Sequence, residues 1–142
     1  MTTKQKLTLA DFEAPDLPCL PNHMGIVVTG VGDAELTAEL KIEPHHMAPN
    51  GFLHAGTVVT LADTTAGHGC VANLPEGASG FTTIELKSNF MGTAREGVIK
   101  CVATCQHLGR TTQLWDATVI DKATNKTIAL FRCTQFIIYP KG

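Results

Sequence analysis

One nearly apolar segment limits what this chain can fold into. Residues 53–77 read LHAGTVVTLADTTAGHGCVANLPEG, and their apolar and small residues recur at helical spacing until Pro75. Such residues occupy almost every side of the predicted helix, so the helix must be covered by another part of the protein. Gly67 and Gly69 each cost about 1 kcal/mol relative to alanine inside a helix. Their presence indicates that another element, or a ligand, approaches the helix closely.

The rest of the chain has the pattern of strands. Residues 34–42 alternate between apolar and polar side chains, which predicts a strand with one solvated face. The other predicted strands are 25–31, 80–92, 97–109, 112–121 and 127–140. Short links between long strands predict antiparallel neighbours. The sheet is the only cover available to the helix, so we expect an α+β fold in which a curved antiparallel six-stranded sheet wraps around one long central helix.

Length and charge exclude several classes of protein. The 142 residues predict a single domain over 1–142, with an irregular, proline-punctuated lead-in over 1–22. The net charge of −2 lacks the basic excess that is typical of nucleic-acid binders. No apolar run is long enough to span a membrane, so we expect neither nucleic acid nor membrane as a partner.

Cysteine and histidine usage argues against disulfides and metal. The five cysteines form no C-x-x-C pair, and no secretory signal precedes them, so we expect reduced thiols and a cytoplasmic protein. Cys70 has no evident partner base, which favours a core position over a nucleophile. His45, His46 and His54 do not have the spacing of a zinc site, and we expect no metal.

The densest polar cluster lies where the predicted helix begins. Asn50, His54, Ala55 and Gly56 come at the junction, and Asp63 follows inside the helix. The first N–H groups of a helix lack partners and carry its positive dipole end, so they can hold an anion or a developing oxyanion. A carboxylate among apolar residues is expensive to bury unless it has a partner or a function.

Two interpretations of this cluster stay open from the residues alone. Asp63 could be a structural carboxylate bonded to Thr60, to Thr64 or to a neighbouring strand, and His54 could be a capping or loop residue. In the catalytic interpretation, nine residues separate His54 from Asp63, which corresponds to about 13.5 Å of helical rise. A shared site would then need His54 of one subunit and Asp63 of another.

Three stretches together resemble the hotdog-fold acyl-CoA thioesterases, in particular the phenylacetate-degradation (PaaI-type) branch. NGFLHAGTVVTLAD (50–63) is similar to the family pattern G-x-x-H-G-G-x6-[DE]. TTIELKSNFM (82–91) is similar to a strand of the T-V-E-L-K-V-N-F type, and HLGRTT (107–112) to an H-x-G-[RK] turn. The resemblance implies a hotdog fold whose subunits pair into one continuous sheet, with active sites at the homodimer interface and often a homotetramer.

The resemblance also implies roles for individual residues. Asp63 matches the catalytic carboxylate, as general base on water or as nucleophile on the thioester. The backbone N–H of Ala55 would polarise the thioester carbonyl, and His54 would orient that carbonyl or the water. Thr83 falls where some members place a hydroxyl that assists the water. No cofactor is implied, since coenzyme A is part of the substrate.

Two departures from the family pattern concern the same loop. The family often has H-G-G where this chain has His54-Ala55-Gly56, and many members carry an amide at the position of Ala48. The nearest amide here is Asn50, which either reaches the site by another path or does not contribute. Small residues at Gly56 and Gly67 would leave room for substrate. Candidate contacts to the coenzyme A phosphates are Lys87, Arg95 and Arg110.

The prediction from the sequence is therefore an acyl-CoA thioesterase, with aryl or medium-chain acyl groups favoured by the resemblance. One alternative is a hotdog hydratase or dehydratase, which would move protons beside the thioester without cleaving it. The other is a non-catalytic protein that binds acyl-CoA.

Overall fold

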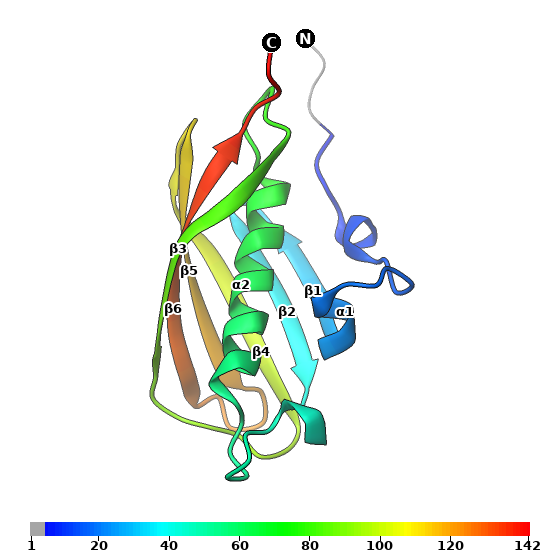
Figure 1. The fold of residues 1–142 in the computed structure, drawn as a ribbon, viewed down its shortest axis with the longest axis vertical. Coiled ribbons are helices and arrows are strands. Elements are labelled where there is room, and N and C mark those ends of the chain that lie inside the picture. Colours follow the sequence, from blue (N-terminus) through cyan, green and yellow to red (C-terminus); the bar gives the residue numbers. More distant parts are fainter. Residues whose placement is uncertain (1–4) are drawn as a thin grey trace.

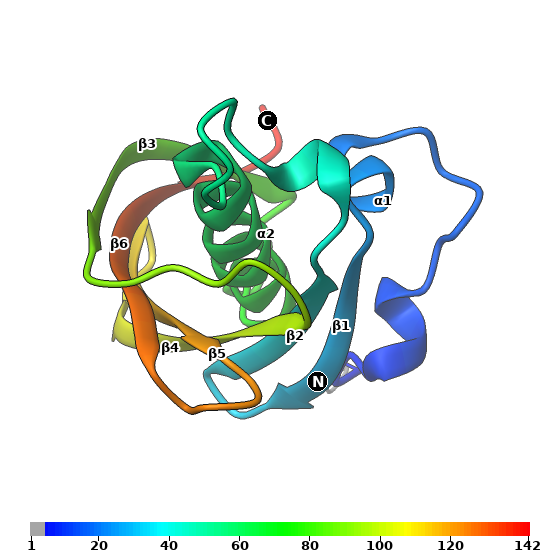
Figure 2. The ribbon, with the colours of Figure 1, turned by 90° about the horizontal axis from the view of Figure 1, so that it is seen from below.

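The computed structural model describes residues 5–142 and confirms the α+β prediction (Figure 1). Its long helix α2 (Ala55–Ala72) lies in the hollow of a curved antiparallel sheet (Figure 2). The six strands have the order β1-β2-β4-β5-β6-β3. Their bounds are β1 (Ile26–Gly32), β2 (Glu35–Lys41), β3 (Gly80–Phe90), β4 (Val98–Leu108), β5 (Thr112–Asp121) and β6 (Thr127–Ile138).

The segment before β1 is more regular than the sequence predicts. It contains a 3₁₀ helix, η1 (Leu9–Phe12), and a short helix, α1 (Leu20–Met24), which ends at Gly25 with φ +80°. Another 3₁₀ helix, η2 (Pro44–His46), follows β2. One-turn helices of this kind carry too few residues for a periodic signal, so the expectation of an irregular lead-in is wrong over these turns. No helix in the described part of the chain is long and apolar enough to cross a membrane.

The link between β3 and β4 also departs from prediction. Short links do join antiparallel neighbours at β1–β2, β4–β5 and β5–β6, but within the described residues β3 pairs only with β6, at the far edge of the sheet. Residues 91–97 instead pass below the start of α2 to reach β4 (Figure 2). Because the sheet curls around the helix, a short link can cross the open end rather than form a hairpin.

The hydrophobic core fills the space between α2 and the concave face of the sheet. Alternate residues of the inner strands point at the helix, as a strand with two different faces requires. The fully buried side chains include Leu36, Leu40, Leu61, Ile99, Trp115 and Val119. This packing covers the apolar helix, which was the constraint that the sequence imposed.

The two helix glycines are explained by aromatic rings. A Cβ at Gly69 would lie 2.6 Å from Cζ3 of the fully buried Trp115. A Cβ at Gly67 would lie 3.1 Å from Cζ of Phe81, which is only half-buried. The close approach that the sequence indicated is therefore made by the sheet. The room that we expected beside Asp63 at Gly67 is occupied by the Phe81 ring.

Alanine substitutions at the two glycines should have different effects on stability. Helix propensity alone favours alanine by about 1 kcal/mol at both positions. At Gly69 the new methyl group forces the enclosed indole of Trp115 to move, and overpacking costs about 1–3 kcal/mol. We expect Gly69→Ala to lower the free energy of unfolding, and Gly67→Ala to leave it unchanged or raise it, in urea titrations. Equal stability of the two variants would contradict this account of Trp115.

Candidate active site

The loop before α2 forms a tight turn that presents the start of the helix. The Ala48 N–H donates to the Phe52 carbonyl at 2.7 Å, and Gly51 adopts φ +84°, where a side chain would be strained. Asn50 lies exposed in this turn, and its Oδ1 accepts from the Phe52 N–H at 3.2 Å. The amide oxygen of Asn50 therefore shapes the turn, as is common for asparagine.

His54 is the N-cap of α2. Its Nδ1 accepts from the Gly56 N–H at 2.7 Å, and its carbonyl accepts from the Thr57 N–H at 3.0 Å. A neutral ring that accepts at Nδ1 carries its proton on Nε2, which then is a donor. A Cβ at Gly56 would lie 2.9 Å from Nδ1, so this glycine allows the cap to form. The capping interpretation is thus correct, and it leaves an exposed donor at the mouth of the helix.

Ala55 supplies the free N–H of the first turn. Within residues 5–142, no acceptor is found for its backbone N–H, whereas the neighbouring Gly56 N–H is taken by His54. The group lies at the positive end of the α2 dipole and Ala55 is exposed. It can therefore donate to an oxygen of a ligand that acquires negative charge.

Asp63 is a half-buried carboxylate without a partner for one of its oxygens. Its Oδ1 is enclosed and makes no hydrogen bond, and burial raises the pKa of Asp63 above the ordinary 3.8. The Thr60 hydroxyl, a partner considered from the sequence, instead donates to the Gly56 carbonyl at 2.7 Å. An orphaned buried oxygen destabilises the fold by about 1–3 kcal/mol, so it points to a ligand or water.

Thr83 faces the helix from β3 and contacts a residue that the sequence analysis missed. Its Oγ1 donates to Oε1 of Gln135, on β6, at 2.7 Å. Gln135 is completely buried, and its Nε2 has no hydrogen-bond partner. The signal was available, because the alternation in β6 places Gln135 on the same inward face as Cys133 and Ile137. A polar residue at an inward strand position is informative.

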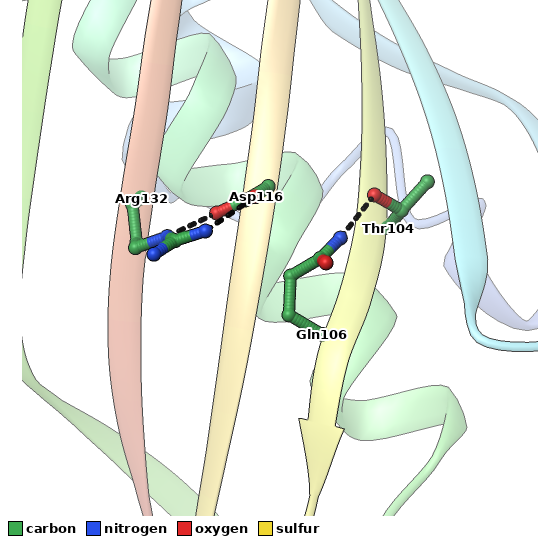
Figure 3. Close-up of polar contacts among 4 residues, drawn as sticks. All are labelled: Thr104, Gln106, Asp116 and Arg132. Carbon is green, nitrogen blue, oxygen red and sulfur yellow. Dashed lines mark hydrogen bonds and ion pairs between the residues drawn. The ribbon is translucent and has the colours of Figure 1, made fainter.

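Lys87 does not lie on the side of the sheet that carries Asp63. It is paired in register with Arg132, whose guanidinium binds the Asp116 carboxylate, with Nη2 to Oδ2 at 2.8 Å. Figure 3 shows this pair, with Thr104 and Gln106, on the face of the sheet away from α2. Paired residues of antiparallel strands share a face, so Lys87 also points away from the helix.

The other two predicted basic contacts lie at different ends of the molecule. Arg95, in the link that passes below the start of α2, places its guanidinium 5.1 Å from the Phe52 ring centroid, within cation–π range. Arg110 lies in the β4–β5 hairpin, where its carbonyl accepts from the Tyr139 hydroxyl. Only Arg95 lies near the helix start within one chain.

His46 has a structural role. It is fully buried, its Nδ1 accepts from the Glu43 N–H at 2.9 Å, and its Nε2 lies 2.8 Å from the Met24 carbonyl. Burial lowers the pKa of His46 below its ordinary value. In the part of the chain that the structure describes, no group of three or more His, Cys, Asp or Glu residues could hold a metal ion.

Comparisons with known proteins agree on one family. Residues 50–128 match the sequence profile of the thioesterase superfamily. A 1,4-dihydroxy-2-naphthoyl-CoA hydrolase of Listeria monocytogenes is 27% identical over 115 residues, which cover 81% of this chain and 92% of that protein. A thioesterase structure from Haemophilus influenzae has a TM-score of 0.87 at 27% identity and covers 98% of this chain and 96% of its own. The PaaI protein of the Escherichia coli phenylacetic acid degradation operon shares the fold, with a TM-score of 0.75 at 20% identity and 83% of each chain covered.

Proposed function

The chain belongs to the thioesterase superfamily, and we propose that this thioester hydrolase cleaves acyl-CoA to a carboxylic acid and free coenzyme A. The observation that carries the proposal is the enclosed Oδ1 of Asp63, which has no partner, on a helix whose first N–H at Ala55 is free. Thioester hydrolysis needs a polarised carbonyl and an activated water. These two groups can supply both.

The proposed mechanism assigns one task to each group. The Ala55 N–H and the α2 dipole stabilise the negative charge that develops on the carbonyl oxygen, and the His54 Nε2–H orients that oxygen. Asp63 takes a proton from water, and the water oxygen bonds to the acyl carbon. The carbon–sulfur bond then breaks, and coenzyme A leaves with the proton that Asp63 held. In the other chemical route an Asp63 oxygen bonds to the carbonyl carbon, the carbon–sulfur bond breaks and coenzyme A leaves as the thiolate, and water then cleaves the mixed anhydride to release the acid and restore Asp63.

We also propose that the working site needs two copies of the chain. β3 is an edge strand and exposes Ile84, Leu86 and Phe90 to solvent. Such an edge pairs readily with another strand, and a second copy in antiparallel register would continue the sheet. The helical rise of about 13.5 Å between His54 and Asp63 is too long for one substrate atom. His54 and Ala55 of one subunit would therefore act with Asp63 of the other.

The same symmetry bears on the coenzyme A contacts. A two-fold axis across β3 reverses the second chain, so its β4–β5 hairpin with Arg110 points toward the end of the first chain that carries Arg95. We assign the phosphates to these two residues and not to Lys87.

Two such dimers would form a tetramer by covering the exposed apolar side chains on the outer face of β6, namely Leu130, Phe136 and Ile138.

An aryl acyl group fits the inner face of β3 best. Phe81, Leu86 and Phe90 all point to the helix side of the strand, and the last two are partly exposed there. A flat apolar ring would pack on these side chains and bury area at about 25 cal/mol per Å². The hydrolase of Listeria monocytogenes is named for an aromatic acyl group, which supports the same choice.

Thiol release from a substrate panel tests the proposed function. Short, medium-chain and aryl acyl-CoAs are incubated with the protein and a thiol-reactive dye, and we expect turnover to be fastest with aryl or medium-chain substrates. Loss of an enoyl absorbance without thiol release would instead favour a hydratase. Tight binding of acyl-CoA in calorimetry with neither reaction would favour a binding protein.

Mixing two inactive variants should restore activity if the site is shared. His54→Ala and Asp63→Asn homodimers each lack one group in both sites. After subunit exchange, half of the dimers are mixed, and each mixed dimer has one intact site. We expect thiol release to recover to about a quarter of the wild-type rate. No recovery, although mass spectrometry shows mixed dimers, would place both residues of a site in one chain.

A further inference from the structure

Two buried glutamines face each other across β5 and β6, and only one of them is fully satisfied. Gln113 and Gln135 are partners in the strand register. The Gln113 Nε2 donates to the Asn73 carbonyl at 2.9 Å, and its Oε1 accepts from Trp115 Nε1 at 2.8 Å. Gln135 uses only Oε1, toward Thr83, and leaves its Nε2 donor enclosed without an acceptor. A buried donor without a partner is costly and calls for an explanation.

The unpaired donor lies level with Asp63. α2 and β3 run in opposite directions, side by side (Figure 1). The Phe81 ring marks the level of Gly67. Moving two residues along β3 to Thr83 advances about 6.8 Å on the same face. Asp63 lies four residues before Gly67 on the same face of α2, about 6 Å back along the helix axis. Thr83 and its register partner Gln135 therefore stand opposite Asp63.

A second observation places Asp63 near the stretch of β6 that carries Gln135. Cys133 lies two residues from Gln135 on the inward face of β6, and its pKa is raised to about 12, first by burial and next by the Asp63 charge. Asp63 is thus close to this stretch of β6. Across the described residues, three enclosed side-chain polar atoms lack a partner, and two of them are the Asp63 Oδ1 acceptor and the Gln135 Nε2 donor. One water molecule would satisfy both.

We propose that the Gln135 amide, oriented by the Thr83 hydroxyl, holds the attacking water against Asp63. The inference rests on the proposed hydrolysis and deepens it. The water accepts a hydrogen bond from Gln135 Nε2–H and donates one to Asp63 Oδ1, which leaves its second lone pair free for the acyl carbon. As that lone pair forms the new carbon–oxygen bond, the proton moves to Asp63. This arrangement makes Asp63 a general base, with Gln135 as the positioning residue.

Methionine substitutions at the two glutamines separate positioning from packing. Gln135→Met keeps the side-chain volume and removes the donor, and we expect kcat to fall about 10- to 100-fold because the water is misplaced. KM for the acyl-CoA should stay within about two-fold, since no substrate contact is lost. Gln113→Met is the matched control, because it breaks satisfied bonds in the same core layer. It should unfold at lower temperature yet retain kcat.

Two further variants report on charge and orientation. Gln135→Glu keeps an acceptor for Thr83 but places a carboxyl group near Asp63, so the acidic limb of the kcat/KM profile should move to higher pH. Thr83→Val should lower kcat, and adding it to Gln135→Met should have little further effect, because both act on one water. Thr83 lies on an edge strand, so this variant tests the proposal even if Gln135→Met fails to fold.

The outcomes distinguish this inference from the function on which it rests. Unchanged kcat in Gln135→Met and Thr83→Val, with activity lost in Asp63→Asn, would overturn the inference and leave the hydrolase standing. An equal loss of kcat in Gln113→Met would also overturn it, because the effect would then be one of packing. Absence of thiol release from the wild-type protein would overturn both.

Discussion

Replacing Asp63 with asparagine should lower kcat for acyl-CoA hydrolysis by at least about 100-fold, the usual scale for removal of a general base. Asparagine has nearly the same shape but cannot take a proton from water. The wild-type enzyme should lose activity at low pH as Asp63 becomes protonated. Because burial raises its pKa, the midpoint of this loss should lie above 3.8. Initial rates of thiol release across pH measure both effects.

The same substitution should raise thermal stability at neutral pH. A folded-state pKa above the unfolded value means that folding favours the protonated carboxyl. That stabilisation is complete below the unfolded pKa and is lost as the pH rises through the folded-state pKa. At neutral pH the wild-type fold therefore contains a charge that it solvates poorly, and asparagine removes this charge. The gain in Tm should shrink as the pH falls toward 3.8.

Asp116→Asn is the matched control for the loss of a carboxylate. Asp116 lies on the outer face of the sheet, where it binds Arg132 (Figure 3). We expect this variant to keep kcat and to lose a little stability, the opposite of Asp63→Asn on both counts. Full activity in Asp63→Asn would show that another group activates the water, and the mechanism would then be wrong.

Replacing Trp115 with alanine should destabilise the fold by about 3–5 kcal/mol, the range seen for large aromatic side chains in cores. The indole is completely buried, packs against Gly69 and donates from Nε1 to Gln113. Its removal leaves a cavity and an unpaired amide oxygen in the same place. Because domains of this size are stable by about 5–15 kcal/mol, the loss should be large in urea unfolding.

A double-mutant cycle makes this prediction specific to the contact with the helix. Gly69→Ala should be destabilising in the wild-type background but not in Trp115→Ala, where the indole no longer blocks the methyl group. Trp115→Phe should lie between the wild type and Trp115→Ala, since it keeps part of the packing and loses the hydrogen bond. Additive effects of Gly69→Ala and Trp115→Ala would contradict the structural explanation of this glycine.

Much of the architecture could be predicted because it follows from local patterns. The alternation in residues 34–42 and in the later strands required a sheet with two different faces, and the apolar helix required that sheet to enclose it. The order of the strands could not be predicted in the same way. β3 and β4 are joined by a short link yet lie apart, because the link crosses the open end of a curved sheet. Curvature is a property of the whole sheet.

The candidate site was likewise only partly predictable from the sequence. The sequence by itself determined that a free helix N-terminus at Ala55 precedes a carboxylate at Asp63, because both depend only on residue type and spacing within one helix. Only the tertiary structure showed that the buried Gln135 has an unpaired donor, and that Lys87 points away from the helix. These residues are far apart in the chain, and strand register sets their positions. The register of β3 against β6 depends on which residues of each strand face α2, and no hairpin turn joins these two strands to fix it locally.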